Sequence, residues 1–62
     1  MIINALIVDD DPEVRSTLSA ILESESYMVE TAENGKKAIQ KCEKTPFDVA
    51  LIDIELPDIK GT

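Results

Sequence analysis

Two apolar runs in this sequence each end at an aspartate. Residues 5–8 (Ala-Leu-Ile-Val) lead into Asp9, and residues 49–52 (Val-Ala-Leu-Ile) lead into Asp53. Because every position of each run is apolar, both runs are typical of strands covered on both faces, as in a parallel sheet. An aspartate that follows such a strand lies at the carboxyl edge of the sheet, where open α/β sheets bind ligands. We therefore expect Asp53 to be the chemical centre of the protein.

The segment after the first run predicts a helix. The first strand is expected to span residues 1–8, and Pro12, a residue favoured at the first helical position, follows shortly after it. Asp11 is the expected N-cap, because a short acceptor side chain can bind the free amides of the first turn. Up to about Ser24, the apolar residues at helical spacing form one stripe: Val14, Leu18, Ile21 and Leu22. The residues expected on the opposite side are Arg15, Ser19 and Glu23.

The middle of the chain predicts a second strand and a second helix. Residues 27–32 alternate between more and less polar side chains, which is typical of a short strand at a sheet edge. Asn34 is the expected N-cap of a helix that ends at Thr45-Pro46. Three side chains of this helix are expected to point inward: Ala38, Ile39 and Cys42. Its lysines are expected to form a solvated face: Lys36, Lys37, Lys41 and Lys44.

Strands that alternate with helices predict an α/β fold with parallel pairing and right-handed crossovers. We expect the first strand in the middle, with the polar second strand on one side and the third on the other. This order, 2-1-3, sends the two helices to opposite faces of the sheet. The carboxyl ends of the first and third strands are then neighbours, and Asp9, Asp10 and Asp53 should meet at one point of the sheet edge.

Composition narrows the functions of this segment. A net charge of −7 in 62 residues argues against binding to nucleic acid or an anionic membrane, because both require Lys and Arg to meet phosphate. The single cysteine, Cys42, cannot form an internal disulfide, and without histidine it cannot build the usual zinc sites. No apolar stretch is long enough to span a membrane, and no basic segment precedes the first run as in a signal peptide. We expect one cytoplasmic domain.

Three carboxylates at one point repel one another unless a cation lies among them. The candidate ligands Asp9, Asp10 and Asp53 are all hard oxygen donors, which favours Mg²⁺ (or Mn²⁺) over zinc or copper. Protein-bound Mg²⁺ keeps several waters and commonly contacts phosphate. One of the carboxylates could therefore accept a phosphoryl group while the ion neutralises the charge on its oxygens.

Three motifs at matching spacing carry a resemblance to a known family. They are residues 5–12 (ALIVDDDP), residues 27–35 (YMVETAENG), and residues 47–53 (FDVALID) followed by residues 56–61 (LPDIKG). The sequence resembles, along almost its whole length, the receiver domain of the response regulators of two-component signalling. The resemblance implies a flavodoxin-like fold and a signalling domain, not an enzyme, that a sensor histidine kinase phosphorylates.

The resemblance also implies a role for each acidic residue. Asp53 corresponds to the aspartate that accepts the phosphoryl group, and it is also a metal ligand. Asp10 corresponds to the direct ligand of Mg²⁺, and Asp9 to an acidic partner that acts largely through water. Glu55 corresponds to the position whose backbone carbonyl completes the coordination by the protein.

Some features depart from the family pattern. Lys60 stands where an acidic or amide residue often precedes the glycine, and Ser26 stands where a glycine is common. The family domain is longer, so residues 1–62 are expected to be its N-terminal half, with three strands and two helices. The other half of the family domain supplies a hydroxyl residue and a lysine that contact the phosphoryl group. We therefore expect Mg²⁺ binding to survive in this chain and switching to be lost.

The half-domain also suggests self-association and alternative functions. A third strand with an open edge invites pairing, and antiparallel pairing of two copies would form a homodimer with one continuous sheet. One alternative function is a structural or dimerisation module whose acidic residues are idle. Another is a Mg²⁺-dependent phosphatase of the haloacid dehalogenase type, suggested by Asp53-Ile54-Glu55. That family requires a second Asp where this sequence has Glu55, so we rank it last.

Overall fold

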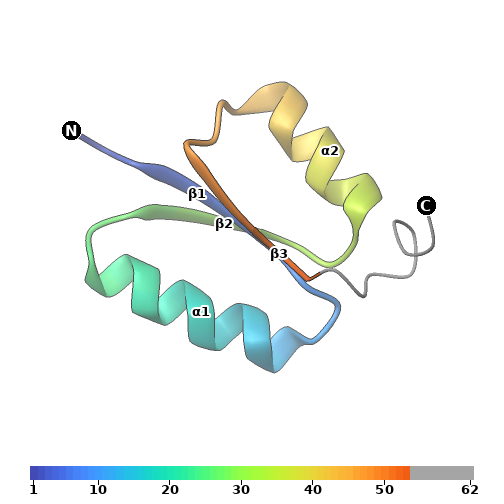
Figure 1. Cartoon of the computed structure of the whole chain (residues 1–62), viewed down its shortest axis with the longest axis horizontal. Coiled ribbons are helices and arrows are strands. Elements are labelled where there is room, and N and C mark those ends of the chain that lie inside the picture. The colour runs from blue at the N-terminus through green and yellow to red at the C-terminus, as the bar shows by residue number, and fades with distance from the viewer. Residues whose placement is uncertain (54–62) are drawn as a thin grey trace.

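Three parallel strands form one sheet, and a helix lies on each of its faces (Figure 1). The computed structural model describes residues 1–53. In chain order the elements are β1 (Asn4–Val8), α1 (Pro12–Ser24), β2 (Met28–Ala32), α2 (Gly35–Lys44) and β3 (Val49–Ile52). The strand order is β2-β1-β3, which confirms the predicted α/β fold and the order 2-1-3. Neither helix within residues 1–53 is long and apolar enough to cross a membrane.

The central strand β1 supplies most of the core. Residues 5–8 are each at most 1% exposed, because β2 and β3 flank the strand and the helices cover its two faces. On the face toward α2, Leu6 and Val8 belong to a cluster that also contains Ala32, Ala38 and Phe47. Full burial of a Leu, Ile or Val side chain contributes roughly 1.5–3 kcal/mol. The prediction of a strand covered on both faces is therefore confirmed for β1.

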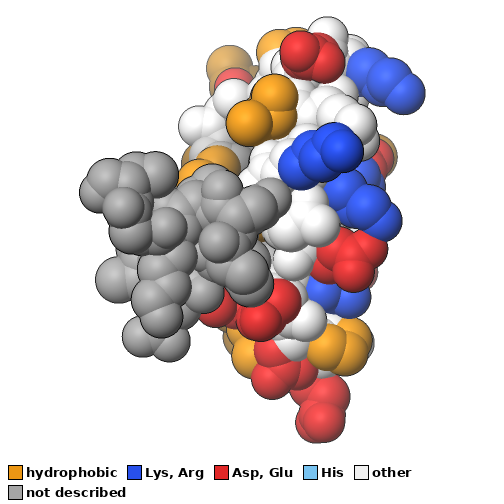
Figure 2. Space-filling model, turned by 90° about the vertical axis from the view of Figure 1, so that its right-hand side faces the viewer, with side chains coloured by type: hydrophobic (Ala, Val, Ile, Leu, Met, Phe, Trp, Pro, Cys, Tyr) orange, Lys and Arg blue, Asp and Glu red, His pale blue; other side chains and the backbone are white. Residues whose placement is uncertain are grey.

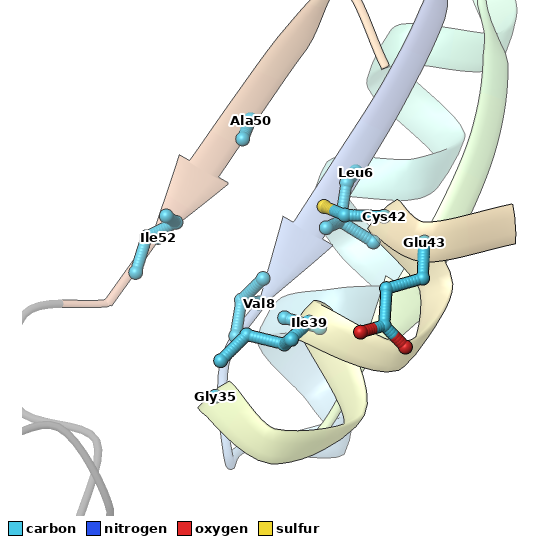
Figure 3. A pocket seen from close by; sticks show the side chains of 9 residues that line it. Leu6, Val8, Gly35, Ile39, Cys42, Glu43, Ala50 and Ile52 are labelled. Atoms are coloured by element: carbon cyan, nitrogen blue, oxygen red, sulfur yellow. The ribbon is translucent and has the colours of Figure 1, made fainter. Parts of the chain in front are cut away.

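The strand β3 is exposed over its whole length, so the predicted burial on both faces is wrong for this strand. It pairs with β1 on one side only, and no other strand within residues 1–53 lies beside it. Ile39 and Cys42 of α2, both predicted to point inward, are exposed as well. Both line an open apolar groove between α2 and β3 (Figure 3). The groove explains the exposure of Ile39, Cys42, Ala50 and Ile52, because no described part of the chain fills it. Val49 and Leu51 lie on the other face of β3, which α1 does not contact.

The predicted orientation of α1 is right for Leu18, Leu22 and Glu23 but wrong for the other residues assigned to its two sides. Arg15 and Ser19, expected on the solvent side, are partly buried together with the leucines of the stripe. Val14 and Ile21 are 36% and 54% exposed instead. The helix contacts β1 and β2 but not β3, so nothing in the described chain covers the flank that carries Val14 and Ile21. An arginine can lie on the covered side because its apolar stem packs while its charged end reaches a polar partner.

Both predicted N-caps are confirmed. The Asp11 carboxylate accepts a hydrogen bond of 2.9 Å from the backbone amide of Glu13, at the start of α1. The Asn34 side chain accepts one of 2.8 Å from the amide of Lys37, at the start of α2. Each cap satisfies an amide that has no partner within its helix. The two caps fix where the chain turns from the loop after each strand into the following helix.

The helix α1 ends in a Schellman motif that places a serine in a left-handed conformation. The amide of Ser26 donates to the carbonyl of Glu23 at 3.0 Å, and that of Tyr27 donates to the carbonyl of Leu22 at 3.1 Å. Ser26 has a φ of 71°, where a residue with a Cβ costs roughly 1–2 kcal/mol. This is the position at which the sequence departs from a common glycine.

Replacing Ser26 with glycine is expected to stabilise the chain by about 1 kcal/mol, because glycine adopts a positive φ without steric cost. The measurement is urea unfolding followed by circular dichroism. Ser24→Gly is the matched control: Ser24 is the last residue of α1 and has no positive φ, and its hydroxyl donates to the carbonyl of Ile21, so this change is expected to destabilise the chain. A lower free energy of unfolding for Ser26→Gly would contradict the strain assigned to this turn.

Candidate functional site

Three carboxylates meet at the carboxyl edge of the sheet, as the sequence predicts. Asp9 and Asp10 follow β1, and Asp53 follows β3. One carboxylate oxygen from each of the three lies within 4.8 Å of those from the other two. Asp9 and Asp53 are partly buried, whereas Asp10 is exposed. Glu55, the fourth predicted site residue, lies outside the described residues.

Backbone hydrogen bonds to the ends of neighbouring strands place two of these aspartates. The amide of Asp9 donates to the carbonyl of Ala32, the last residue of β2, at 3.1 Å. The amide of Asp53 donates to the carbonyl of Val8, the last residue of β1, at 2.9 Å. The ladder of the sheet thus continues one residue beyond the strands and carries both carboxylates on rigid backbone. In Figure 2, acidic side chains predominate toward the lower end of this side of the molecule, and Lys and Arg side chains lie mostly in its upper part, with further acidic side chains among them.

Two of the three aspartates after β1 accept hydrogen bonds from different backbone amides. The Asp9 carboxylate accepts a hydrogen bond of 2.9 Å from the amide of Asp11, which is an Asx-turn. The Asp11 carboxylate is occupied in capping α1. The Asp11 carboxylate therefore caps the helix, while the Asp9 carboxylate both closes the loop and belongs to the cluster with Asp10 and Asp53.

Arg15 contacts the acidic loop, a contact that the sequence pattern did not predict. Its Nη1 donates a hydrogen bond of 2.7 Å to the backbone carbonyl of Asp9 in a partly buried position. Glu33, in the loop after β2, has its pKa lowered chiefly by the hydrogen bond and charge of Lys37, and to a smaller extent by the charge of Arg15. The hydrogen bond of the guanidinium is thus to the loop after β1. One feature of the sequence could have predicted this contact: Arg15 lies in the first turns of a helix that directly follows the acidic loop.

The donor set suits a hard divalent cation. All three side chains are carboxylates, and the sequence contains no histidine. Two oxygens on opposite sides of one Mg²⁺ lie about 4.2 Å apart, so carboxylates within 4.8 Å of one another can share one ion directly or through a bound water. The same proximity makes the three charges repel one another when no cation is bound. Cys42 lies on α2 in the apolar groove and is not part of this cluster.

Comparison with known proteins supports the assignment that the fold and the acidic edge suggest. The sequence model of the response regulator receiver domain matches residues 5–62. The chain is 43% identical over 56 residues to the transcriptional regulatory protein CpxR homolog of Haemophilus influenzae, covering 90% of this chain and 24% of that protein. It is 41% identical over 59 residues to the transcriptional regulatory protein TrcR of Mycobacterium tuberculosis, covering 95% and 23% respectively.

A histidine kinase is also similar. The signal transduction histidine-protein kinase BarA of Escherichia coli is 36% identical over 56 residues, which cover 90% of this chain and 6% of the kinase. No solved structure matches the chain. The match along residues 5–62 shows that the chain belongs to the response regulator receiver domain family. It spans about a quarter of the length of the two regulatory proteins.

Because the three carboxylates lie close together, replacing one of them is expected to stabilise the chain when no cation is present and to abolish its stabilisation by a cation. Without divalent cations, Asp10→Asn is expected to stabilise the chain by about 1 kcal/mol, because one of the repelling charges is removed. Saturating Mg²⁺ is expected to raise the melting temperature of the unchanged chain but not that of Asp10→Asn. Thermal unfolding followed by circular dichroism measures both effects.

The control is Glu23→Gln, which removes one negative charge from the exposed side of α1 near its other end. This variant is expected to keep the full response to Mg²⁺. An equal response of Asp10→Asn and the unchanged chain would argue against a cation site at the cluster.

Proposed function

We propose that Asp53 is the phosphoacceptor of this receiver chain and that the acidic cluster binds Mg²⁺ (or Mn²⁺). The observation that supports this most is the position of Asp53: it directly follows β3 and lies within 4.8 Å of two other carboxylates at the sheet edge. Open α/β sheets bind their ligands at this edge. The family membership adds phosphoryl transfer as the chemistry.

In the proposed reaction, a carboxylate oxygen of Asp53 attacks the phosphorus of a phosphohistidine. A P–O bond forms as the P–N bond breaks, and the electron pair of that bond stays on the ring nitrogen. Because the other ring nitrogen carries a proton, the leaving group is neutral imidazole. Asp10 would hold Mg²⁺ directly, Asp9 largely through water, and Glu55 through its backbone carbonyl. A bound ion would supply the positive charge that phosphoryl transfer requires. The rigid ladder at Val8 keeps Asp53 in place for in-line attack.

The proposed donor is a sensor histidine kinase, so this chain acts as a signalling domain and not as an enzyme. Family membership and the similarity to a histidine-protein kinase support this partner. We propose that the 62 residues accept phosphate but do not switch by themselves. The resemblance assigns the hydroxyl and lysine that respond to the phosphoryl group to a segment beyond residue 62, and a switch needs such an element to bias.

Incubation with acetyl phosphate and Mg²⁺ is expected to add one phosphoryl group to the chain, which intact-mass spectrometry detects. Asp53→Asn should prevent the adduct, whereas Asp48→Asn, five residues earlier in the same segment, should not. Removing Mg²⁺ with a chelator should also prevent it, because the charge on the phosphoryl oxygens is then not neutralised. No adduct on the unchanged chain would instead favour the structural module with idle acidic residues.

A second proposal concerns self-association: two copies of the chain pair through β3. The amide of Asp53 points to β1, and successive amides of a strand point to opposite sides, so those of Ala50 and Ile52 face the outer edge. Within residues 1–53 no strand covers this edge, and Ile52 is 52% exposed. Antiparallel pairing around a two-fold axis would satisfy these amides and join the two sheets.

Ala50→Pro is expected to convert the homodimer to a monomer, because proline removes an outward amide without removing a hydrogen bond to β1. Ala50→Val keeps the amide and is expected to remain dimeric. Sedimentation velocity at micromolar concentration measures the mass, and circular dichroism verifies that each variant is folded. A folded monomer of the unchanged chain would refute pairing through β3.

A further inference from the structure

Arg15 holds the peptide that joins two of the acidic residues. It is the only arginine of the sequence, and its Nη1 donates to the carbonyl of Asp9 at 2.7 Å. That carbonyl belongs to the peptide unit between Asp9 and Asp10. A strong hydrogen bond from a charged donor therefore fixes the orientation of this peptide plane, and with it the direction of the Asp10 side chain.

The other polar groups of Asp9 are held as well. Its amide donates to Ala32 of β2, and one carboxylate oxygen accepts from the amide of Asp11. With Arg15, three different segments of the chain thus hold the amide, carboxylate and carbonyl of this one residue. Asp10 is exposed, so the direction of its carboxylate depends on the peptide that precedes it.

From these contacts we infer that Arg15 is a positioning residue of the acidic cluster. By holding the Asp9 carbonyl, it directs the carboxylates of Asp9 and Asp10 toward Asp53, so that the three can share one divalent cation. This inference rests on the proposed function, because it requires the cluster to bind a cation. Arg15 itself contacts neither the ion nor the phosphoryl group.

The direction in which cation affinity changes when Arg15 is replaced distinguishes positioning from a purely electrostatic or a purely structural role. Arg15 is a positive charge near a cation site, so its removal should strengthen cation binding if only electrostatics matter. If Arg15 merely stabilised the fold, its removal would lower the melting temperature and leave the affinity of the folded chain unchanged. Positioning alone predicts weaker binding by the folded chain when the arginine is replaced.

The experiment measures Mn²⁺ binding to the 62-residue chain, using the electron paramagnetic resonance signal of free Mn²⁺. Arg15→Met is expected to weaken binding about ten-fold, as for loss of other groups that orient metal ligands. Arg15→Lys, which keeps the charge and N–H donors but not the planar guanidinium, should recover part of the lost affinity. Lys41→Met is the control, because it removes an equal charge from a residue that pairs with Glu30 and not with the Asp9 carbonyl. It should bind as tightly as the unchanged chain or slightly tighter.

A second measurement needs no variant and remains informative if Arg15→Met does not fold. Coupling between two sites is reciprocal, so a cation that needs the Arg15 contact must also strengthen it. Mg²⁺ is therefore expected to slow the exchange of the guanidinium protons of Arg15 with water. Because the sequence has one arginine, the nuclear magnetic resonance signal is unambiguous.

Each outcome decides between the proposals. Weaker binding by folded Arg15→Met, with recovery in Arg15→Lys, supports positioning, and so does slower proton exchange. Unchanged or tighter binding by folded Arg15→Met, or exchange that ignores Mg²⁺, overturns the role of Arg15 and leaves the proposed cation site intact. No Mn²⁺ binding by the unchanged chain overturns the cation site itself, and the inference with it.

Discussion

The hydrogen bonding of β1 to a strand on each side is the constraint on which the rest of the structure depends. Its side chains fill the core on both faces, so the strand cannot shift register without moving apolar residues out of the interior. The carbonyl of Val8 binds the amide of Asp53 at one side of its end, and the amide of Asp9 binds β2 at the other. The same ladder that closes the core therefore also brings the acidic residues together.

The sequence predicted the parts of this arrangement that local patterns determine. Continuous apolar runs identified the two strands that neighbour the site, and short polar side chains before each helix identified the caps at Asp11 and Asn34. Topology rules then gave the strand order and the meeting of three carboxylates. These predictions succeeded because each depends on a few adjacent residues or on the handedness of a crossover.

The predictions that were wrong all concern which other parts of the chain lie beside a residue, and a local sequence pattern does not specify this. The stripe of Val14 and Ile21 is apolar, but its periodicity does not say which element covers it. Apolar residues of β3 predicted burial, although in the described chain only one edge of that strand is paired. Arg15 was expected on the solvent side, whereas its guanidinium binds the carbonyl of Asp9, six residues earlier in the chain. The predicted role of Glu55 is not one of these failures and stays a prediction, because Glu55 lies outside the described residues.

The parallel pairing of β1 with β3 has a consequence for the order in which the protein folds. At the start of this pairing, Asn4 binds Asp48, 44 positions further along the chain, whereas the pairing with β2 joins Asn4 to Met28. Closing the longer loop costs more entropy, and contacts distant in sequence form slowly. The first helix and the β1–β2 pair can thus form while Asp53 is still far from its partners. We therefore expect the acidic cluster to be completed late in folding, and a cation that requires all three carboxylates to bind only after β3 has paired with β1.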